Sequence, residues 1–179
     1  MKTIILSALA ASMVFLNACS DDMLDVKFDL PLGKVTFTLP AQTSSGTFDL
    51  SPTTIALNLD SIASANGVSL DKFETVKVKS CMFKILSPAG ANFNALQSAE
   101  AFVRDPASGQ ATGKRIAMIE NIPDGKTELE LLMTDENVLD IIRKPFEISA
   151  KVVTTEPVSQ ATSIEATIVL EVVANPTNK

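Results

Sequence analysis

Two glutamates, Glu128 and Glu130, lie two positions apart in a stretch where polar and apolar residues alternate. Residues two apart in a strand share a face, so both carboxylates are expected on one side of a sheet. Paired carboxylates can hydrolyse glycosides when a cleft raises the pKa of one of them. Their alternation with Leu129 and Leu131 indicates instead the solvent-facing side of a strand. We therefore assign no catalytic residue.

Three further acids, Asp135, Glu136 and Asp140, could offer oxygen ligands to a calcium ion. Their spacing lacks the alternating aspartates of a helix–loop–helix calcium site, and the first turn of a helix explains them more simply. The stretch Gly109–Lys114 has two glycines and a lysine, as phosphate-binding loops do. It is too short between its glycines, and a predicted strand follows it rather than a helix. We predict no metal or cofactor site.

The composition removes several kinds of chemistry. The chain has 179 residues, of which 21 are acidic and 15 basic, and it contains no histidine, tryptophan or tyrosine. Without histidine there is no Ser–His or Cys–His pair for nucleophilic catalysis, and the commonest transition-metal ligand is missing. The formal net charge of −6 and the absence of a basic patch argue against a nucleic-acid partner. We expect a protein that is not an enzyme.

The N-terminal segment has the layout of a secretory signal peptide. Lys2 precedes an uncharged apolar run, residues 3–16, which is too short to span a bilayer as a helix. Leu16-Asn17-Ala18-Cys19 resembles the lipobox of bacterial lipoproteins, although Asn17 departs from the small residue usual there. The resemblance covers about the first two dozen residues. It implies cleavage after residue 18 and lipid on Cys19, which becomes the first mature residue.

A lipid on Cys19 would hold the protein at the bacterial cell envelope, and we expect the outer membrane. Each buried methylene contributes about 0.8 kcal/mol, so two or three chains bind firmly. The longest later apolar segment, residues 164–174, is interrupted by Glu165, Thr167 and Glu171, so we expect the chain to be anchored without crossing the bilayer.

The residues after Cys19 bear on which side of the membrane the domain faces. Ser20-Asp21-Asp22 is similar to the acidic export signal of surface lipoproteins from Bacteroidota-type bacteria, which implies a domain outside the cell. A solvated acidic tether over residues 19–23 explains the same residues, and both interpretations stay open. If Cys19 is lipidated, Cys81 has no partner within the chain. We expect Cys81 to be a small buried residue of a strand.

One folded domain is expected over residues 24–176, after a signal peptide over residues 1–18. Alternating polar and apolar residues predict strands. Their expected ranges are 24–30, 34–39, 53–59, 74–86 with a bulge near Ser80 or burial on both faces, 99–104, 114–119, 127–133, 146–155 and 162–174. In the 127–133 strand Leu129, Leu131 and Met133 are expected to face inward.

Helical structure is expected at only a few places. A short helical turn or a loop is predicted over residues 60–67, with Asp60 as a candidate cap. A helical turn is predicted over residues 92–97, with Phe93 and Leu96 inward. One helix is predicted over residues 134–143, capped by Thr134 or Asp135. Short connections between many strands favour an all-β fold, an antiparallel β-sandwich of the Ig-like or Greek-key type. A closed barrel is the alternative.

Four functions remain compatible with these features. We favour an envelope lipoprotein whose non-catalytic β-sandwich is a binding or interaction module for a protein or glycan partner. The alternative is a structural or adhesive subunit of the cell surface. An acid-only hydrolase is disfavoured by the absence of histidine, and a lipid carrier would require an internal cavity.

Overall fold

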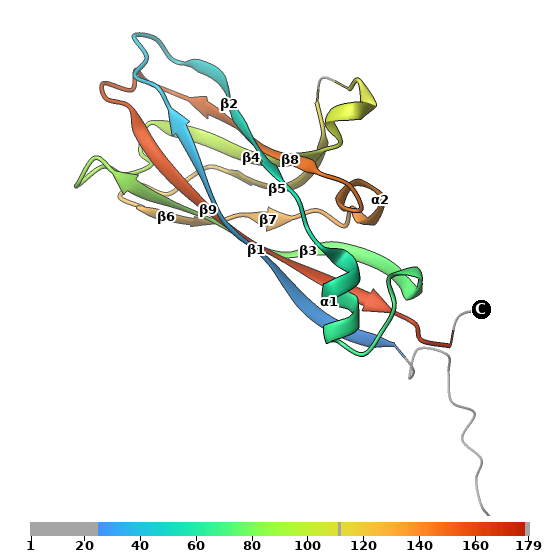
Figure 1. Ribbon diagram of the computed structural model, residues 1–179. Coiled ribbons are helices and arrows are strands. Elements are labelled where there is room, and N and C mark those ends of the chain that lie inside the picture. The colour runs from blue at the N-terminus through green and yellow to red at the C-terminus, as the bar shows by residue number, and fades with distance from the viewer. Residues whose placement is uncertain (1–24, 111, 178–179) are drawn as a thin grey trace, which may run out of the picture.

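Two antiparallel sheets packed face to face form the all-β sandwich predicted from the strand pattern (Figure 1). The computed structural model describes residues 25–110 and 112–177. Sheet A contains, in order, β1 (Val26–Leu39), β9 (Thr162–Ala174), β3 (Phe73–Ser87) and β6 (Glu128–Glu130). Sheet B contains β2 (Gly46–Ile55), β8 (Phe146–Thr154), β4 (Leu96–Arg104), β5 (Lys114–Glu120) and β7 (Leu132–Met133). The predicted signal peptide, Cys19 and the acidic tether lie outside the described residues.

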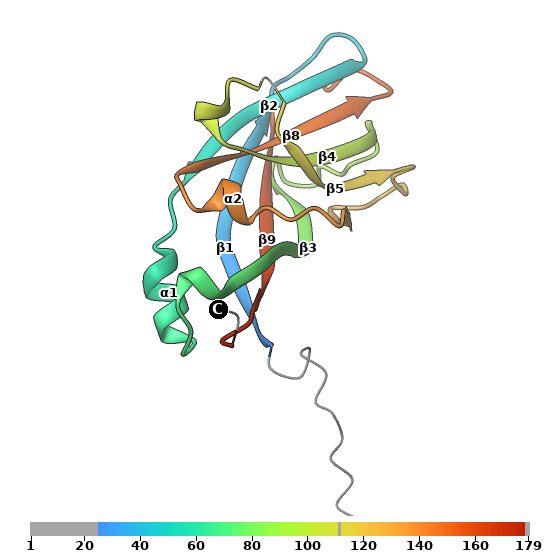
Figure 2. The same ribbon diagram turned by 90° about the vertical axis from the view of Figure 1, so that its right-hand side faces the viewer.

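The core lies between the two sheets. Alternate residues of β8 and β9 are buried, as their sequence pattern predicts. Burying one large aliphatic side chain contributes about 1.5–3 kcal/mol, so this alternation determines which face of each strand turns inward. In Figure 2 the strands of sheet B run across those of sheet A. The inward-facing apolar residues of β9 are Ile164, Ala166, Ile168, Leu170, Val172 and Ala174.

Bulges in the long strands account for the irregular parts of the pattern. The two strands predicted over residues 24–30 and 34–39 are one strand, β1, with a register shift between Pro31 and Lys34. Pro31 and Gly33 are tolerated there because β1 is an edge strand. In β3 the register shifts between Val78 and Ser80, which confirms the predicted bulge.

Helical elements are short. They are α1 (Leu59–Ala65), α2 (Leu139–Ile142) and the 3-10 turns η2 (Leu70–Lys72) and η3 (Pro106–Ser108). The predicted turn over residues 60–67 is confirmed as α1, but its cap is Asn58, whose Oδ1 accepts from the Ser61 amide at 3.1 Å, and not Asp60. Within residues 25–110 and 112–177, no helix combines the length and apolarity needed to cross a membrane.

The turn predicted over residues 92–97 has the expected burial but a different backbone. Phe93 and Leu96 are 2% and 5% exposed, as expected of inward-facing residues. The Leu96 amide donates to the Phe93 carbonyl in a single turn, and Leu96 already begins β4. The strand predicted over residues 53–59 is also displaced, since β2 starts at Gly46 and ends at Ile55.

The segment predicted as one strand over residues 127–133 belongs to both sheets (Figure 1, tan). Leu129 pairs with Phe83 of β3, whereas Leu132 pairs with Met118 of β5. Leu129 and Leu131 are buried as predicted, but Met133 is 40% exposed, so its predicted inward orientation is wrong. Because the partner strand changes after Leu131, the alternation of buried and exposed side chains does not continue to Met133.

The helix predicted over residues 134–143 is reduced to α2. The Thr134 amide donates to the Ile116 carbonyl at 3.0 Å, so the chain is still paired with β5 at this point. Asn137 then bonds to the backbone of β3. Thr134 and Asp135 are therefore not helix caps. An isolated helix of this length is marginal, and hydrogen bonds to two neighbouring strands replace its first turns.

Candidate binding groove

Glu128 and Glu130 lie exposed on β6, as predicted for the solvent-facing side of a strand. Glu128 accepts a hydrogen bond from Lys84 Nζ at 2.5 Å, and this bond raises the pKa of the lysine. Glu130 makes no ion pair among the described residues. The two carboxylates therefore differ: one is compensated by a cation, and the other is available to a partner.

The other candidate acids do not share a site. Asp135 pairs with Lys77 at 2.6 Å, and Glu136 pairs with Lys114 at 3.4 Å. Asp140 lies in α2. Within the described residues no three acidic or cysteine side chains gather as metal ligands would. The glycine-containing loop is followed by β5 from Lys114 onward, in agreement with the predicted strand.

Cys81 lies on the inner face of β3 and is completely buried, as predicted. Burial raises the pKa of its thiol to about 12, because the thiolate would lose its hydration. The thiol therefore stays protonated at neutral pH and lacks the thiolate character that a nucleophile requires.

An open groove of about 500 Å³ runs along β6, at the connection between β5 and β6. Met82 of β3 and Ile119 of β5 border it, together with Pro123 in the connection. The polar side of the groove is formed by Glu128 and Glu130. Its volume exceeds that of the pocket on the outer face of sheet B, which is about 270 Å³.

The groove exists because the pairing between β5 and β7 begins only at Leu132, so the residues before Leu132 are not bonded to β5. Leu132 still pairs with Met118 of β5. One residue earlier, the Leu131 amide donates to the Cys81 carbonyl of β3 at 2.9 Å, and the Ile85 amide donates to the Thr127 carbonyl at 3.0 Å. The chain therefore moves from one sheet to the other between Leu131 and Leu132, and it leaves a gap beside β5.

The outer edge of β6 has no strand partner within the described residues. Backbone groups of Thr127 and Leu131 bond to β3, and groups of alternate residues point to opposite sides of an antiparallel strand. The amides and carbonyls of Glu128 and Glu130 are therefore directed away from β3. An unpaired strand edge of this kind is a ready template for another extended chain.

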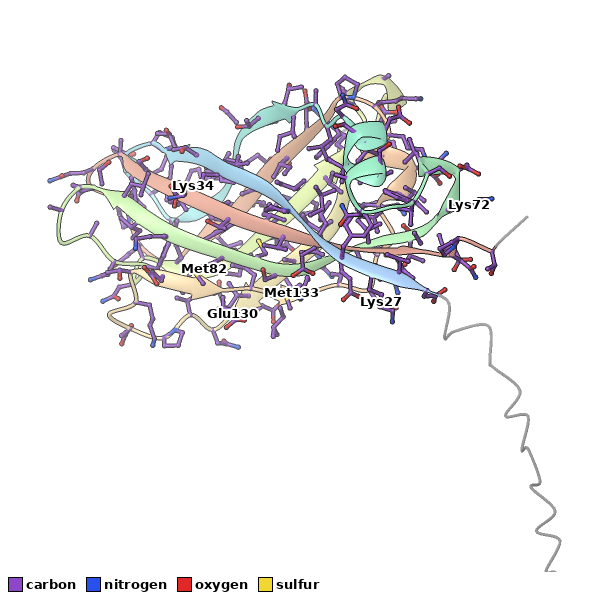
Figure 3. All side chains as sticks on the ribbon, turned by 60° about the horizontal axis from the view of Figure 1, so that its bottom comes forward. Lys27, Lys34, Lys72, Met82, Glu130 and Met133 are labelled. Atoms are coloured by element: carbon purple, nitrogen blue, oxygen red, sulfur yellow. The ribbon has the colours of Figure 1, made fainter. Side chains whose placement is uncertain are left out.

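Exposed apolar side chains accompany this edge. Met82, Leu132 and Met133 are 43%, 71% and 40% exposed. Figure 3 shows Met82, Glu130 and Met133 close together on the side of the molecule formed by β3, β6 and β7. Apolar side chains clustered beside polar ones on a surface often mark an interaction site.

One wall of the groove is held in place by a neighbouring loop. Asn94 Oδ1 accepts from the Gly125 amide at 2.6 Å, and the Phe93 amide donates to the Lys126 carbonyl at 2.8 Å. Phe93 is itself buried in the core. Two hydrogen bonds from this loop thus hold the connection between β5 and β6, and a partner would meet a wall that is already ordered.

The charges around the groove are mainly negative. Glu120, Asp124 and Glu130 make no ion pair with any residue that the structure describes, and Lys126 is the nearby cation. Counting these four groups gives a formal charge of −2, since Glu128 and Lys84 compensate each other. The groove therefore favours a cationic partner.

A second pocket, of about 270 Å³, lies on the outer face of sheet B. Lys151 Nζ lies 5.4 Å from the centre of the Phe102 ring and 4.0 Å from Asp49. Arg104, which also borders this pocket, forms an ion pair with Glu147. These cations already have partners within the sheet. The pocket therefore has fewer unpaired charges for a ligand than the groove has.

Sequence reasoning did not find the groove, although one signal was present. Leu131, Leu132 and Met133 are consecutive apolar residues. A strand turns consecutive residues to opposite faces, so an uninterrupted apolar run in a sheet with one wet face must expose part of itself. The prediction followed the alternation of Leu129, Leu131 and Met133 and did not take account of Leu132.

Comparisons with known proteins give no family for this chain. No family model and no curated protein matches it. Among solved structures, a chain of infectious bursal disease virus is 15% identical with a TM-score of 0.36, covering 97% of this chain and 37% of its own length. A chain of Triatoma virus is 11% identical with a TM-score of 0.35, covering 99% and 79%. At these values the likeness carries no argument about function.

Proposed function

We propose that this protein is a lipid-anchored protein of the bacterial cell envelope whose β-sandwich is a non-catalytic binding module, with the groove along β6 as its contact surface. The lipobox-like residues before Cys19 support the anchor. The observation that carries the binding function is the unpaired outer edge of β6 beside exposed Met82 and Leu132. An ordered loop holds the wall of the groove, which favours recognition of a specific partner.

The position of the groove suits a protein tethered through its N-terminus. β1 begins at Val26, which pairs with Ala174, whereas Met82 beside the groove pairs with Thr167. These two points are seven residues apart along β9, roughly 23 Å at about 3.3 Å per residue. In Figure 1 β6 lies far from the beginning of β1. A tether before β1 would leave the groove accessible.

The anchor is tested on cells grown with labelled palmitate. The wild-type chain and Cys81→Ser are expected to incorporate label, and mass spectrometry should find lipid on Cys19. Cys19→Ser should incorporate none and should leave the membrane fraction. A mature protein with a bare residue 19 would overturn the lipid anchor.

The contact surface is tested by placing a photoreactive amino acid at Leu132 in intact cells. Illumination is expected to give one crosslinked product, which the additional change Met82→Ser should diminish. The control position is Thr54, an exposed residue of β2. Equal crosslinking from both positions, or none from Leu132, would remove the groove as the contact surface. A product containing two copies of this chain would support the structural-subunit alternative.

A further inference from the structure

We infer that the groove binds an extended peptide segment of alternating basic and apolar residues, which adds to the outer edge of β6 as a further strand of sheet A. The inference rests on the proposed function and adds to it the chemical class of the partner. Three features of the groove support it: its backbone groups, its apolar border and its charge.

The backbone of β6 supplies the hydrogen bonds for strand addition. β6 and the residues on either side of it bond to β3 through Thr127, Leu129 and Leu131. This leaves the amides and carbonyls of Glu128 and Glu130 on the opposite edge. These groups have the spacing that an antiparallel or parallel strand requires. At about 3.3 Å per residue, β6 is long enough to pair with a segment of about three to five residues.

Side chains beside this edge suit the alternation of an added strand. Successive residues of a strand point to opposite faces, so every second residue of the segment would point to the same side as Met82. Met82 is unbranched, polarisable and 43% exposed, and such a side chain adapts to different apolar partners. Ile119 and Pro123 offer further apolar contacts along the groove.

Charge selects a basic segment over an acidic one. Glu130 lies on β6 itself, and Glu120 and Asp124 lie in or beside the connection, while Lys126 is the opposing cation. A lysine or arginine of the segment could pair with Glu130, whose carboxylate has no ion-pair partner among the described residues. The same charge disfavours phosphates and anionic lipid head groups. Without tryptophan or tyrosine, the usual aromatic platforms for a sugar are also missing.

The test uses the full chain in mild detergent with two fluorescent probe peptides, Lys-Val-Lys-Val-Lys-Val-Lys and the same peptide with glutamate in place of lysine. Fluorescence anisotropy is expected to show binding of the lysine peptide and at least tenfold weaker binding of the glutamate peptide. N-methylation of alternate backbone amides should weaken binding at least tenfold for one of the two possible sets and much less for the other. That asymmetry is specific to strand addition.

Two charge-reversal variants locate the contact. Glu130→Lys is expected to weaken binding of the lysine peptide about tenfold. Asp60→Lys makes the same charge change on α1, at the other end of the molecule, and should leave binding unchanged (Figure 1). Hydrogen exchange should also show slower exchange of the Glu128 and Glu130 amides when the lysine peptide is bound.

Several outcomes would overturn the inference. They are equal binding of both probe peptides, insensitivity to N-methylation, equal effects of the two variants, and no binding of the lysine peptide. If any of these occurs while Leu132 still crosslinks in cells, the groove remains the contact surface but its partner has another chemistry. If Leu132 does not crosslink, the proposed function fails as well.

Discussion

The two ends of the gap between β3 and β5 differ, because one is closed and the other is open. At one end Asn137 Oδ1 accepts from the Val76 amide at 3.1 Å, and the Val138 amide donates to the Val76 carbonyl at 2.8 Å. Lys114 Nζ, from β5, donates to the Asn137 carbonyl at 3.1 Å. At the other end the chain pairs with β5 only from Leu132 onward, and the groove opens beside the residues that precede Leu132.

The difference shows how an irregular segment can protect a sheet edge or leave it accessible. Asn137 uses its side-chain amide where a strand would use its backbone, and Val138 beside it is 1% exposed. Among the residues that the structure describes, no comparable side chain covers the outer edge of β6, and Leu132 beside it is 71% exposed. Exposed strand edges favour unwanted association. Since Asn137 closes one end of the gap between β3 and β5, the open edge of β6 at the other end is suited to binding a partner.

The largest expected effect separates two adjacent leucines. Leu131→Ala should lower the free energy of unfolding by about 3 kcal/mol, because Leu131 is 1% exposed and its removal leaves a cavity. Leu132→Ala should change it by less than about 0.5 kcal/mol, because Leu132 is largely exposed. Urea denaturation measures both. Similar losses for the two variants would mean that Leu132 belongs to the core.

The sealed end is tested with Asn137→Leu, which keeps the side-chain size but removes the hydrogen bonds to the Val76 amide and the Glu74 carbonyl. We expect a loss of about 2 kcal/mol, the cost of unsatisfied backbone groups. Hydrogen exchange of the Val76 amide should become faster. Asp135→Asn removes only an exposed ion pair and should have no measurable effect. If the two variants behave alike, Asn137 does not seal the edge.

The carbonyl of Cys81 accepts from the Leu131 amide, where the segment over residues 127–133 changes sheets. Ionisation of the Cys81 thiol makes the stability of the fold depend on pH in the alkaline range. Its folded-state pKa of about 12 exceeds the ordinary value of 9.0, so above about pH 9 the unfolded state loses the proton first. The contribution is complete below pH 9 and is lost as the pH rises toward 12, by up to about 1.4 kcal/mol per pH unit.

Comparison with Cys81→Ala isolates this contribution, because other groups titrate in both proteins. The stability difference between wild type and variant, measured in urea at pH 7, 9 and 10.5, should stay constant up to pH 9 and then shrink. A difference that does not change across this range would show that the thiol is not protected from ionisation.

The smallest expected effect concerns the negative charge of the groove. Lys84→Met removes the cation that pairs with Glu128, and the two side chains are 52% and 49% exposed. Such a pair contributes little to stability, so the urea midpoint should not change measurably. The groove becomes more acidic, and the lysine probe peptide should bind about twofold tighter at low salt, an effect that screening removes. Weaker binding would contradict the electrostatic argument.

Much of the fold is encoded in local patterns. The alternation in residues 162–174 predicted β9 within its observed bounds, and the change of apolar register near Ser80 predicted the bulge in β3. Cys81 is buried as expected of a small residue in an apolar strand. These features depend on the period-two geometry of extended backbone, which neighbouring residues determine among themselves.

The shortening of the helix predicted over residues 134–143 and the exposure of Met133 both involve a partner strand distant in sequence. The predicted helix over residues 134–143 lost its first turns because Thr134 bonds to β5 and Asn137 to β3. Met133 is exposed because the chain changes sheets after Leu131. The alternation of side chains did not predict these pairings, and the uninterrupted apolar run over residues 131–133 was a local sign of the change of sheet.

The sequence by itself determined most of the strands and their inward faces, and the lipobox-like start of the chain, because each depends on residue types within a short stretch. The tertiary structure alone decided which sheet each strand joins. It also decided that the Asn137 side chain bonds to the backbone of β3 in place of a neighbouring strand, and that Glu128 and Glu130 lie on an open edge beside Met82. Hydrogen-bond pairing between strands is a long-range choice among chemically identical backbone groups. Only packing of the whole chain resolves it.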